Sequence, residues 1–173
     1  DFPVAEAGGR VFFLTAIFGA AYPLARMREA ARKEGPRAVL GRLSALRGGL
    51  FARRCRFRVD DGPEERAEIV FAGNGGLRDV LSGSRWTGDD PVLDGAAGDW
   101  RGLIGAGRAA LLGAAGFSGL DPDTALFDFD TLRVREAGRS KTRAVIDGEP
   151  AKFDGPVLVK RFAATVPVLE PLA

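Results

Sequence analysis

Histidine is absent from the 173 residues of the chain, and cysteine occurs once. Without histidine, the sequence excludes zinc sites that need imidazole ligands and catalytic triads built on a histidine base. The single cysteine, Cys55, excludes an internal disulfide and a cysteine-rich metal cluster. One free cysteine fits a reducing compartment, and at this position we expect a small buried apolar residue.

Long uncharged runs are also missing. The longest, Val11 to Ala25, contains Gly19 and Pro23 and is shorter than the ~20 residues that a membrane-spanning helix needs. No basic segment followed by a cleavage pattern opens the sequence, so we expect no signal peptide and a cytoplasmic protein. The net charge is only +2, which predicts no nucleic-acid partner.

What is present is ordinary for a globular protein. Apolar residues make up 46% of the chain and charged residues 28%. A chain of this length can bury a substantial core. We therefore expect residues 1–173 to form a single domain.

Extended segments dominate the pattern. In Arg53–Asp60 the arginines at 54, 56 and 58 alternate with Cys55, Phe57 and Val59, as expected for a strand with one buried face. In Ala125–Glu136 the apolar phase slips by one residue, which predicts a bulge. Residues 1–7 are expected to form a short extended lead-in, and residues 10–17 a buried strand that Gly19 ends with an unusual backbone angle. Further strands are expected at residues 66–71, 144–146, 157–162 and 164–169.

Helices are fewer. Apolar residues recur at helical spacing after Pro23 until Gly35-Pro36, and two more helices are expected over Arg37–Leu46 and Trp100–Leu112. A long loop is expected from Gly73 to Gly98. The predicted fold class is α+β and mainly β, an antiparallel β-sandwich-like domain with two or three covering helices.

The segment Ile146-Asp-Gly-Glu-Pro150 predicts a hairpin turn, because Asp147 and Gly148 both tolerate positive φ. Its second strand is expected at Pro156–Phe162. Glu149 follows the turn, and Pro150 restricts the backbone behind it. A carboxylate on such a rigid corner suits a general base, although the same pattern is also typical of an ordinary exposed hairpin.

Four segments in this order resemble the second domain of the lipid kinases that act on diacylglycerol and sphingosine. They are Gly9–Gly19, Ala72–Gly75, Ile146–Pro150 and Val157–Pro167. The resemblance extends from about Val4 to Pro167. The Gly-Gly-Asp-Gly-Thr phosphate-binding loop of those kinases does not occur in this chain. The resemblance therefore implies a C-terminal domain whose partner is an N-terminal nucleotide-binding domain absent from this sequence.

The resemblance also implies a chemistry, namely phosphoryl transfer from ATP to a lipid hydroxyl. It makes Glu149 the general base. Asp147 would either hold the turn or orient the metal-bound nucleotide, and both roles stay open. Gly73, Asn74 and Gly75 would face the cleft between the domains. ATP, held mainly by the absent domain, and Mg²⁺ are the implied cofactors.

The acidic segment from Asp89 to Asp94 departs from the pattern. Many of the kinases have an apolar strand after this Asp-Gly, where this chain has Ala96-Ala-Gly-Asp-Trp100. Mg²⁺ prefers oxygen ligands in octahedral geometry, so Asp94, with Asp89 and Asp90, is the candidate metal ligand. The alternative is a set of solvated acidic side chains.

Arginines supply the candidate contacts to an anionic membrane surface, and they are Arg26, Arg28, Arg54, Arg56 and Arg58. The alternative is that they line a solvated face. Two other functions also remain open. One is a non-catalytic domain that binds lipid or docks a partner. The other is a phosphotransferase domain like that of NAD kinases.

Overall fold

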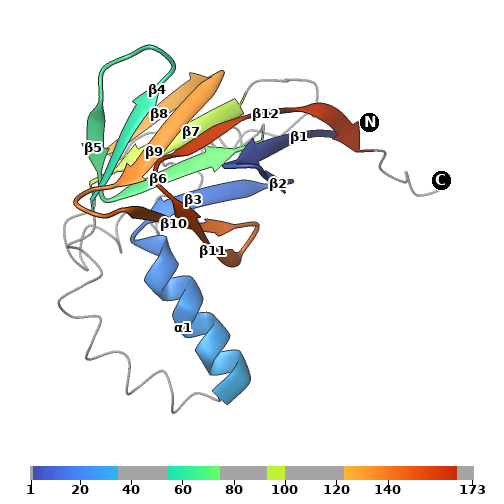
Figure 1. Ribbon diagram of the computed structural model, residues 1–173, viewed down its shortest axis with the longest axis vertical. Helices are drawn as coiled ribbons and strands as arrows, with labels where there is room; N and C mark the ends of the chain where they lie inside the picture. Colours follow the sequence, from blue (N-terminus) through green and yellow to red (C-terminus); the bar gives the residue numbers. More distant parts are fainter. Residues whose placement is uncertain (1, 35–53, 75–92, 100–122, 167–173) are drawn as a thin grey trace.

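The computed structural model describes residues 2–34, 54–74, 93–99 and 123–166. In these residues the chain forms two six-stranded antiparallel sheets and one helix (Figure 1). The mainly-β α+β fold expected from the sequence is confirmed. The helices expected over Arg37–Leu46 and Trp100–Leu112 lie outside the described residues.

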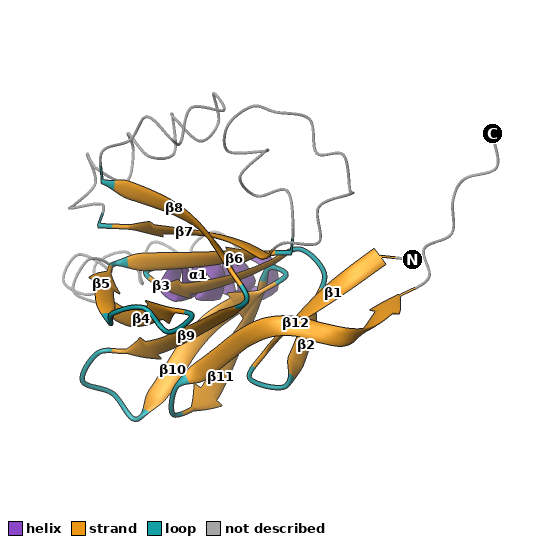
Figure 2. Ribbon diagram, turned by 90° about the horizontal axis from the view of Figure 1, so that it is seen from above, coloured by secondary structure: helices purple, strands orange, loops and turns teal. Residues whose placement is uncertain are grey.

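Each sheet combines strands from distant parts of the chain (Figure 2). The first sheet has the order β2 (Arg10–Phe12), β1 (Phe2–Ala7), β12 (Val157–Val166), β9 (Thr131–Glu136), β4 (Cys55–Val59) and β5 (Glu65–Ala67). The second sheet has the order β11 (Glu149–Asp154), β10 (Lys141–Ile146), β3 (Thr15–Gly19), β6 (Ile69–Gly73), β7 (Leu93–Gly98) and β8 (Thr124–Phe129).

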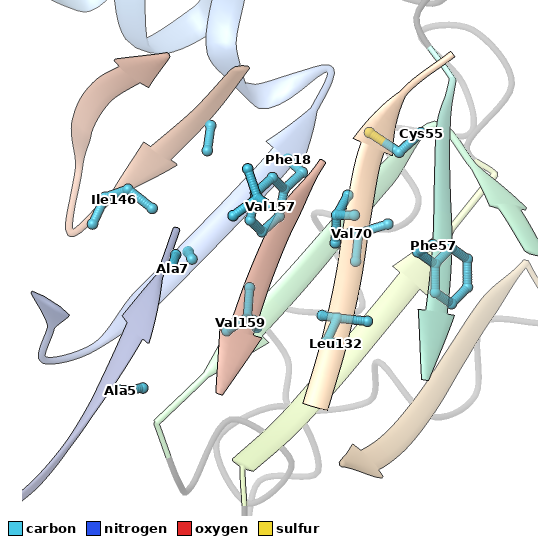
Figure 3. Packing of buried hydrophobic residues seen from close by; sticks show 14 of the residues in the cluster. Ala5, Ala7, Phe18, Cys55, Phe57, Val70, Leu132, Ile146, Val157 and Val159 are labelled. Carbon is cyan, nitrogen blue, oxygen red and sulfur yellow. The ribbon is translucent and has the colours of Figure 1, made fainter. Parts of the chain in front are cut away.

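The core lies between the two sheets (Figure 3). Alternate residues of each strand point inward, as the pleat of a strand requires. Cys55 and Phe57 are buried there, as the alternation in this segment predicted. Burial, followed by the negative charge of Glu136, raises the pKa of the Cys55 thiol to about 12. The thiol therefore stays protonated at neutral pH, as expected for a residue that only fills space.

Three segments expected as continuous strands are each divided between the two sheets. The chain changes sheets at Phe13–Leu14, at Glu68 and at Asp130. The phase slip in Ala125–Glu136 is therefore not a bulge. Phe129 ends β8 in one sheet and Leu132 lies in β9 of the other, and both are buried in the same core.

Two further expectations were wrong. The segment expected to close the domain as two strands forms one strand, β12, over its described residues. The end of the expected loop, Leu93–Gly98, is strand β7, paired between β6 and β8. Its glycines and alanines have low strand propensity, but pairing with two neighbours outweighs it. Gly95 leaves room for the ring of Phe127, whose nearest atom lies 2.3 Å from where a Cβ would be.

Helix α1 (Ala21–Glu34) covers one end of the second sheet, packing on β10, β3 and β11, with Pro23 in its first turn as expected (Figure 1).

A buried carboxylate connects the first sheet to the second sheet and its helix. Glu136, on β9, accepts a hydrogen bond from Nε of Arg143 on β10 at 2.8 Å. The Arg143 guanidinium also lies 5.6 Å from the ring centre of Tyr22 on α1.

Candidate functional site

The Asp147-Gly148 turn joins β10 directly to β11. Asp147 has φ +45° and Gly148 has φ +85°, and Ile146 pairs with Glu149 across the two-residue loop. Two consecutive residues of positive φ are the conformation that this dipeptide favours. The turn expected from the sequence is confirmed, but its second strand starts at Glu149 itself and not at Pro156.

The Asp147 carboxylate is directed at the backbone between β2 and β3. It accepts hydrogen bonds from the N–H groups of Phe13 at 2.7 Å, and of Leu14 and Thr15 at 2.9 Å each. The Asp147 N–H in turn donates to the Thr15 carbonyl at 2.9 Å. The side chain therefore holds a turn, namely the Phe13–Leu14 corner where the chain changes sheets.

Asn74 holds the same corner from the other side. It follows β6, and its side-chain Nδ2 donates to the Phe13 carbonyl at 3.2 Å. Its backbone N–H donates to the Leu14 carbonyl at 3.1 Å. Two motifs that the sequence analysis selected separately thus meet at one pair of residues. Gly75 lies outside the described residues.

Three of the selected positions, connected through Thr15, line up at one end of the second sheet. Asp147 is bonded to Thr15, Thr15 pairs with Gly73, and Gly73 pairs with Asp94. Asp94 is buried, with 5% of its surface exposed. Among residues 2–34, 54–74, 93–99 and 123–166, no three acidic, histidine or cysteine side chains gather as metal ligands. Asp94 therefore stays a predicted ligand, and its companions Asp89 and Asp90 lie outside the described residues.

The Phe13–Leu14 corner is apolar and exposed. Phe13 is 47% exposed and Leu14 is 67% exposed, although both were expected inside a buried strand. They continue the apolar run of Val11 and Phe12, so no sequence signal separates them from the core. Only the hydrogen bonds that the Asp147 carboxylate accepts and the Asn74 side chain donates reveal that this dipeptide is held at the surface in one conformation.

Glu149 is exposed at the start of an edge strand. The turn before it is held from two directions, since Nη2 of Arg28 on α1 donates to the Gly148 carbonyl at 2.7 Å and Asp147 binds the corner. Glu149 thus stands on a fixed support, as expected. Arg28, a candidate membrane contact in the sequence analysis, is engaged in this support.

Two hollows lie elsewhere on the described surface. One, of about 440 Å³, is lined mainly by basic residues of the turn before β10 and of strands β10 and β11, and the other, of about 220 Å³, lies on the first sheet. Neither includes Glu149.

Replacing Asp147 tests how much its hydrogen bonds to the Phe13–Leu14 corner stabilise the fold. Asp147→Ala removes the acceptor of three backbone N–H groups. It also places an alanine at a position of positive φ, which aspartate tolerates better than alanine does. We expect a loss of about 2 kcal/mol in the free energy of unfolding, since hydrogen bonds to a charged group are worth ~1.5–3 kcal/mol each when buried and less at an exposed site. Urea titration followed by circular dichroism measures this loss.

The control is Asp147→Gly, which also removes the carboxylate but accepts positive φ without strain. The difference between the two variants isolates the backbone angle. If Asp147→Gly unfolds at the same urea concentration as the wild type, the hydrogen bonds to the corner contribute nothing to stability.

No helix in the described residues has the length and apolar character that a membrane crossing requires. No protein-family model matches the sequence, and no curated protein matches it.

Solved structures do resemble this one. A protein from Bacillus anthracis str. Sterne assigned to the diacylglycerol kinases matches 93% of this chain and 53% of its own, with a TM-score of 0.59 and 16% identity. Another from the same strain, also assigned to the diacylglycerol kinases, matches 93% of this chain and 54% of its own, with a TM-score of 0.57 and 18% identity. An NAD kinase from Archaeoglobus fulgidus reaches a TM-score of only 0.45, from which we draw nothing. The chain thus spans about half the length of these kinases, and its fold is that of the C-terminal domain which the sequence resemblance predicted.

Proposed function

We propose that this chain is the C-terminal domain of an ATP-dependent lipid kinase of the diacylglycerol kinase type. The observation that carries the proposal is the convergence at the Phe13–Leu14 corner, where Asp147 and Asn74 bind the same two residues. These two came from separate motifs of the lipid-kinase resemblance. The fold shared with the Bacillus anthracis proteins supports the same assignment.

Glu149 is the proposed general base. As the lipid hydroxyl oxygen attacks the γ-phosphorus of ATP, its proton passes to the Glu149 carboxylate, and the bond to the ADP oxygen breaks. An exposed carboxylate on a fixed turn can reach a substrate that approaches from outside the domain. Asp147 acts in this scheme as a positioning residue, because its carboxylate is occupied by the backbone of the corner.

The nucleotide and its metal belong mainly to a second domain. We propose that an N-terminal nucleotide-binding domain supplies the phosphate-binding loop and the other wall of the cleft. Gly73 and Asn74 would lie on the side that faces it, although this chain buries both residues. Residue Asp94 is the proposed contribution of this chain to Mg²⁺ binding. Its buried carboxylate has the right chemistry, and Asp128 lies directly opposite it on β8, but the described residues bring no third such side chain to the two to complete a site.

The test uses the complete protein that contains this chain. Incubation with ATP, Mg²⁺ and diacylglycerol in detergent micelles should yield phosphorylated lipid, whereas the 173-residue chain alone should yield none. Sphingosine and NAD⁺ are the comparison substrates. Phosphorylation of NAD⁺ instead of any lipid would overturn the proposal and favour the NAD-kinase-like alternative.

A second candidate is a non-catalytic domain that docks a partner. The exposed Phe13 and Leu14, held rigidly, favour it, because an ordered apolar surface loses little conformational entropy on binding. The kinase assay separates the two functions. A complete protein that lacks a Gly-Gly-Asp-Gly-Thr loop and phosphorylates none of these substrates would leave docking as the function.

A further inference from the structure

The outer face of the first sheet carries a group of arginines on two neighbouring strands. On β4, Arg56 and Arg58 alternate with the buried Cys55 and Phe57. On β9, Arg133 and Arg135 alternate in the same way with the buried Leu132 and Val134. The pleat therefore points all four guanidinium groups away from the core.

These arginines face one another across the strands. Arg56 lies directly opposite Arg135, and Arg58 lies directly opposite Arg133. Like charges placed opposite each other on one face of an antiparallel pair destabilise the sheet. Each pair therefore requires a compensating negative charge or has an energetic cost.

The first pair has its negative charge. Glu64 accepts hydrogen bonds from Nη1 of Arg56 at 3.1 Å and from Nε and Nη2 of Arg135 at 3.1 and 2.9 Å. These bonds, with the one from Arg135 as the largest cause, lower the pKa of the Glu64 carboxyl group. The carboxylate is thus an oxyanion bound between two arginines of facing strands.

The second pair has no such partner in the part of the chain that the structure describes. Neither the Arg58 side chain nor the Arg133 side chain makes a hydrogen bond or an ion pair there. The two side chains line a hollow of about 220 Å³ together with Arg56, Glu64, Arg135 and Pro156. A water molecule occupies ~30 Å³ of liquid, so the hollow has room for a larger polyatomic anion.

We propose that Arg58 and Arg133 bind the phosphate group of a phosphomonoester between them. The phosphate would lie between these two arginines as the Glu64 carboxylate lies between Arg56 and Arg135. Guanidinium groups match the oxygens of phosphate in bidentate geometry, and two of them balance its charge of about −2 at neutral pH. The phosphate belongs either to a soluble compound or to a lipid headgroup at a membrane surface. The site lies on the sheet that does not carry Glu149, so it does not depend on the proposed kinase activity.

The test compares two variants that lose the same charge. Arg58→Gln with Arg133→Gln removes the site, whereas Arg10→Gln with Arg161→Gln removes two exposed arginines elsewhere on the same sheet. Inorganic phosphate, titrated against chloride at equal ionic strength, should raise the melting temperature of the wild type and of the control variant. The Arg58/Arg133 variant should require at least ten times more phosphate for the same rise.

A vesicle arm separates the two sources of phosphate. Sedimentation with phosphatidylcholine vesicles that contain phosphatidic acid, compared with phosphatidylcholine alone, should show binding that the Arg58/Arg133 variant loses if the source is a headgroup. Phosphate stabilisation without vesicle binding assigns the site to a soluble compound. An equal response of both variants to phosphate would refute the site, as would binding to an RNA oligonucleotide without any response to phosphate.

A charge reversal protects the test against a simple loss of folding. Arg58→Glu places a negative charge opposite Arg133, so it should raise the melting temperature without phosphate and abolish the response to phosphate. A lower melting temperature in this variant, together with a preserved phosphate response, would contradict the proposal.

Discussion

Glu149→Gln in the complete protein is expected to reduce turnover of lipid by about 10² to 10⁴-fold, the usual contribution of a general base. The amide has nearly the same shape as the carboxylate but does not accept the hydroxyl proton. Glu149 is exposed on an edge strand, so the substitution should leave the unfolding midpoint unchanged. Initial rates at saturating ATP and lipid, measured beside a thermal melt, check both expectations.

The matched control is Glu65→Gln. Glu65 is also an exposed glutamate at the start of an edge strand, β5, but on the first sheet. Its substitution should change neither turnover nor stability. Full activity in Glu149→Gln would remove this residue from the chemistry, while an equal loss in both variants would point to a general effect of charge on lipid binding.

Gly19→Ala is expected to give the largest loss of stability, about 3–5 kcal/mol, because it combines backbone strain with a backbone collision. Gly19 ends β3 with φ +87°, an angle that L side chains rarely adopt. A Cβ there would lie 2.2 Å from the Glu68 carbonyl oxygen and 3.2 Å from Sγ of Cys55. The carbonyl cannot move freely, because it accepts a hydrogen bond from the Ala20 N–H at 3.1 Å. For a chain of this size, a fall of about 8–15 °C in the melting temperature would follow.

Gly138→Ala separates the two causes. Gly138 also has positive φ, at +69°, but a Cβ there would meet no atom within 4 Å. We expect a loss of only ~1–2 kcal/mol, which is the cost of the left-handed backbone alone. Equal losses at the two glycines would show that the contact with Glu68 is relieved by a backbone shift.

Local patterns predicted those features that depend on a few neighbouring residues. The alternation from Arg54 to Val59 identified β4, and the Asp147-Gly148 dipeptide identified its turn, since each depends on the geometry of one strand or one loop. The unusual angle at Gly19 was also predicted. These features require no knowledge of what lies across the sheet.

The changes of sheet could not be read in the same way. At Asp130 the chain leaves β8 in one sheet and enters β9 in the other. In the sequence, this change of sheet gives the same one-residue slip in the apolar pattern as a bulge does. The strand Leu93–Gly98 is built of small residues, so it depends on its two neighbours for its conformation. In both cases the deciding contacts come from residues far away in the sequence.

The sequence indicated which residues belong to the candidate site but not which of them contact the same part of the chain. Asp147, Asn74 and Glu149 were selected as separate residues, and the resemblance to lipid kinases gave them roles. The Phe13–Leu14 corner, which links Asp147 to Asn74, was expected in the core because apolar residues surround it. Hydrogen bonds between residues more than sixty positions apart cannot be derived from spacing.

The pairing of β1 with β12 has a consequence for biosynthesis. The two strands lie side by side, with Phe2 opposite Val166, so the first sheet is incomplete until β12 has been translated. At ~5–20 residues per second, the nascent chain spends seconds with the β9 edge that later binds β12 uncovered. A ribosome-associated chaperone should therefore engage the nascent chain in the interval when β1 and Thr131–Glu136 have left the exit tunnel and β12, their shared neighbour, has not.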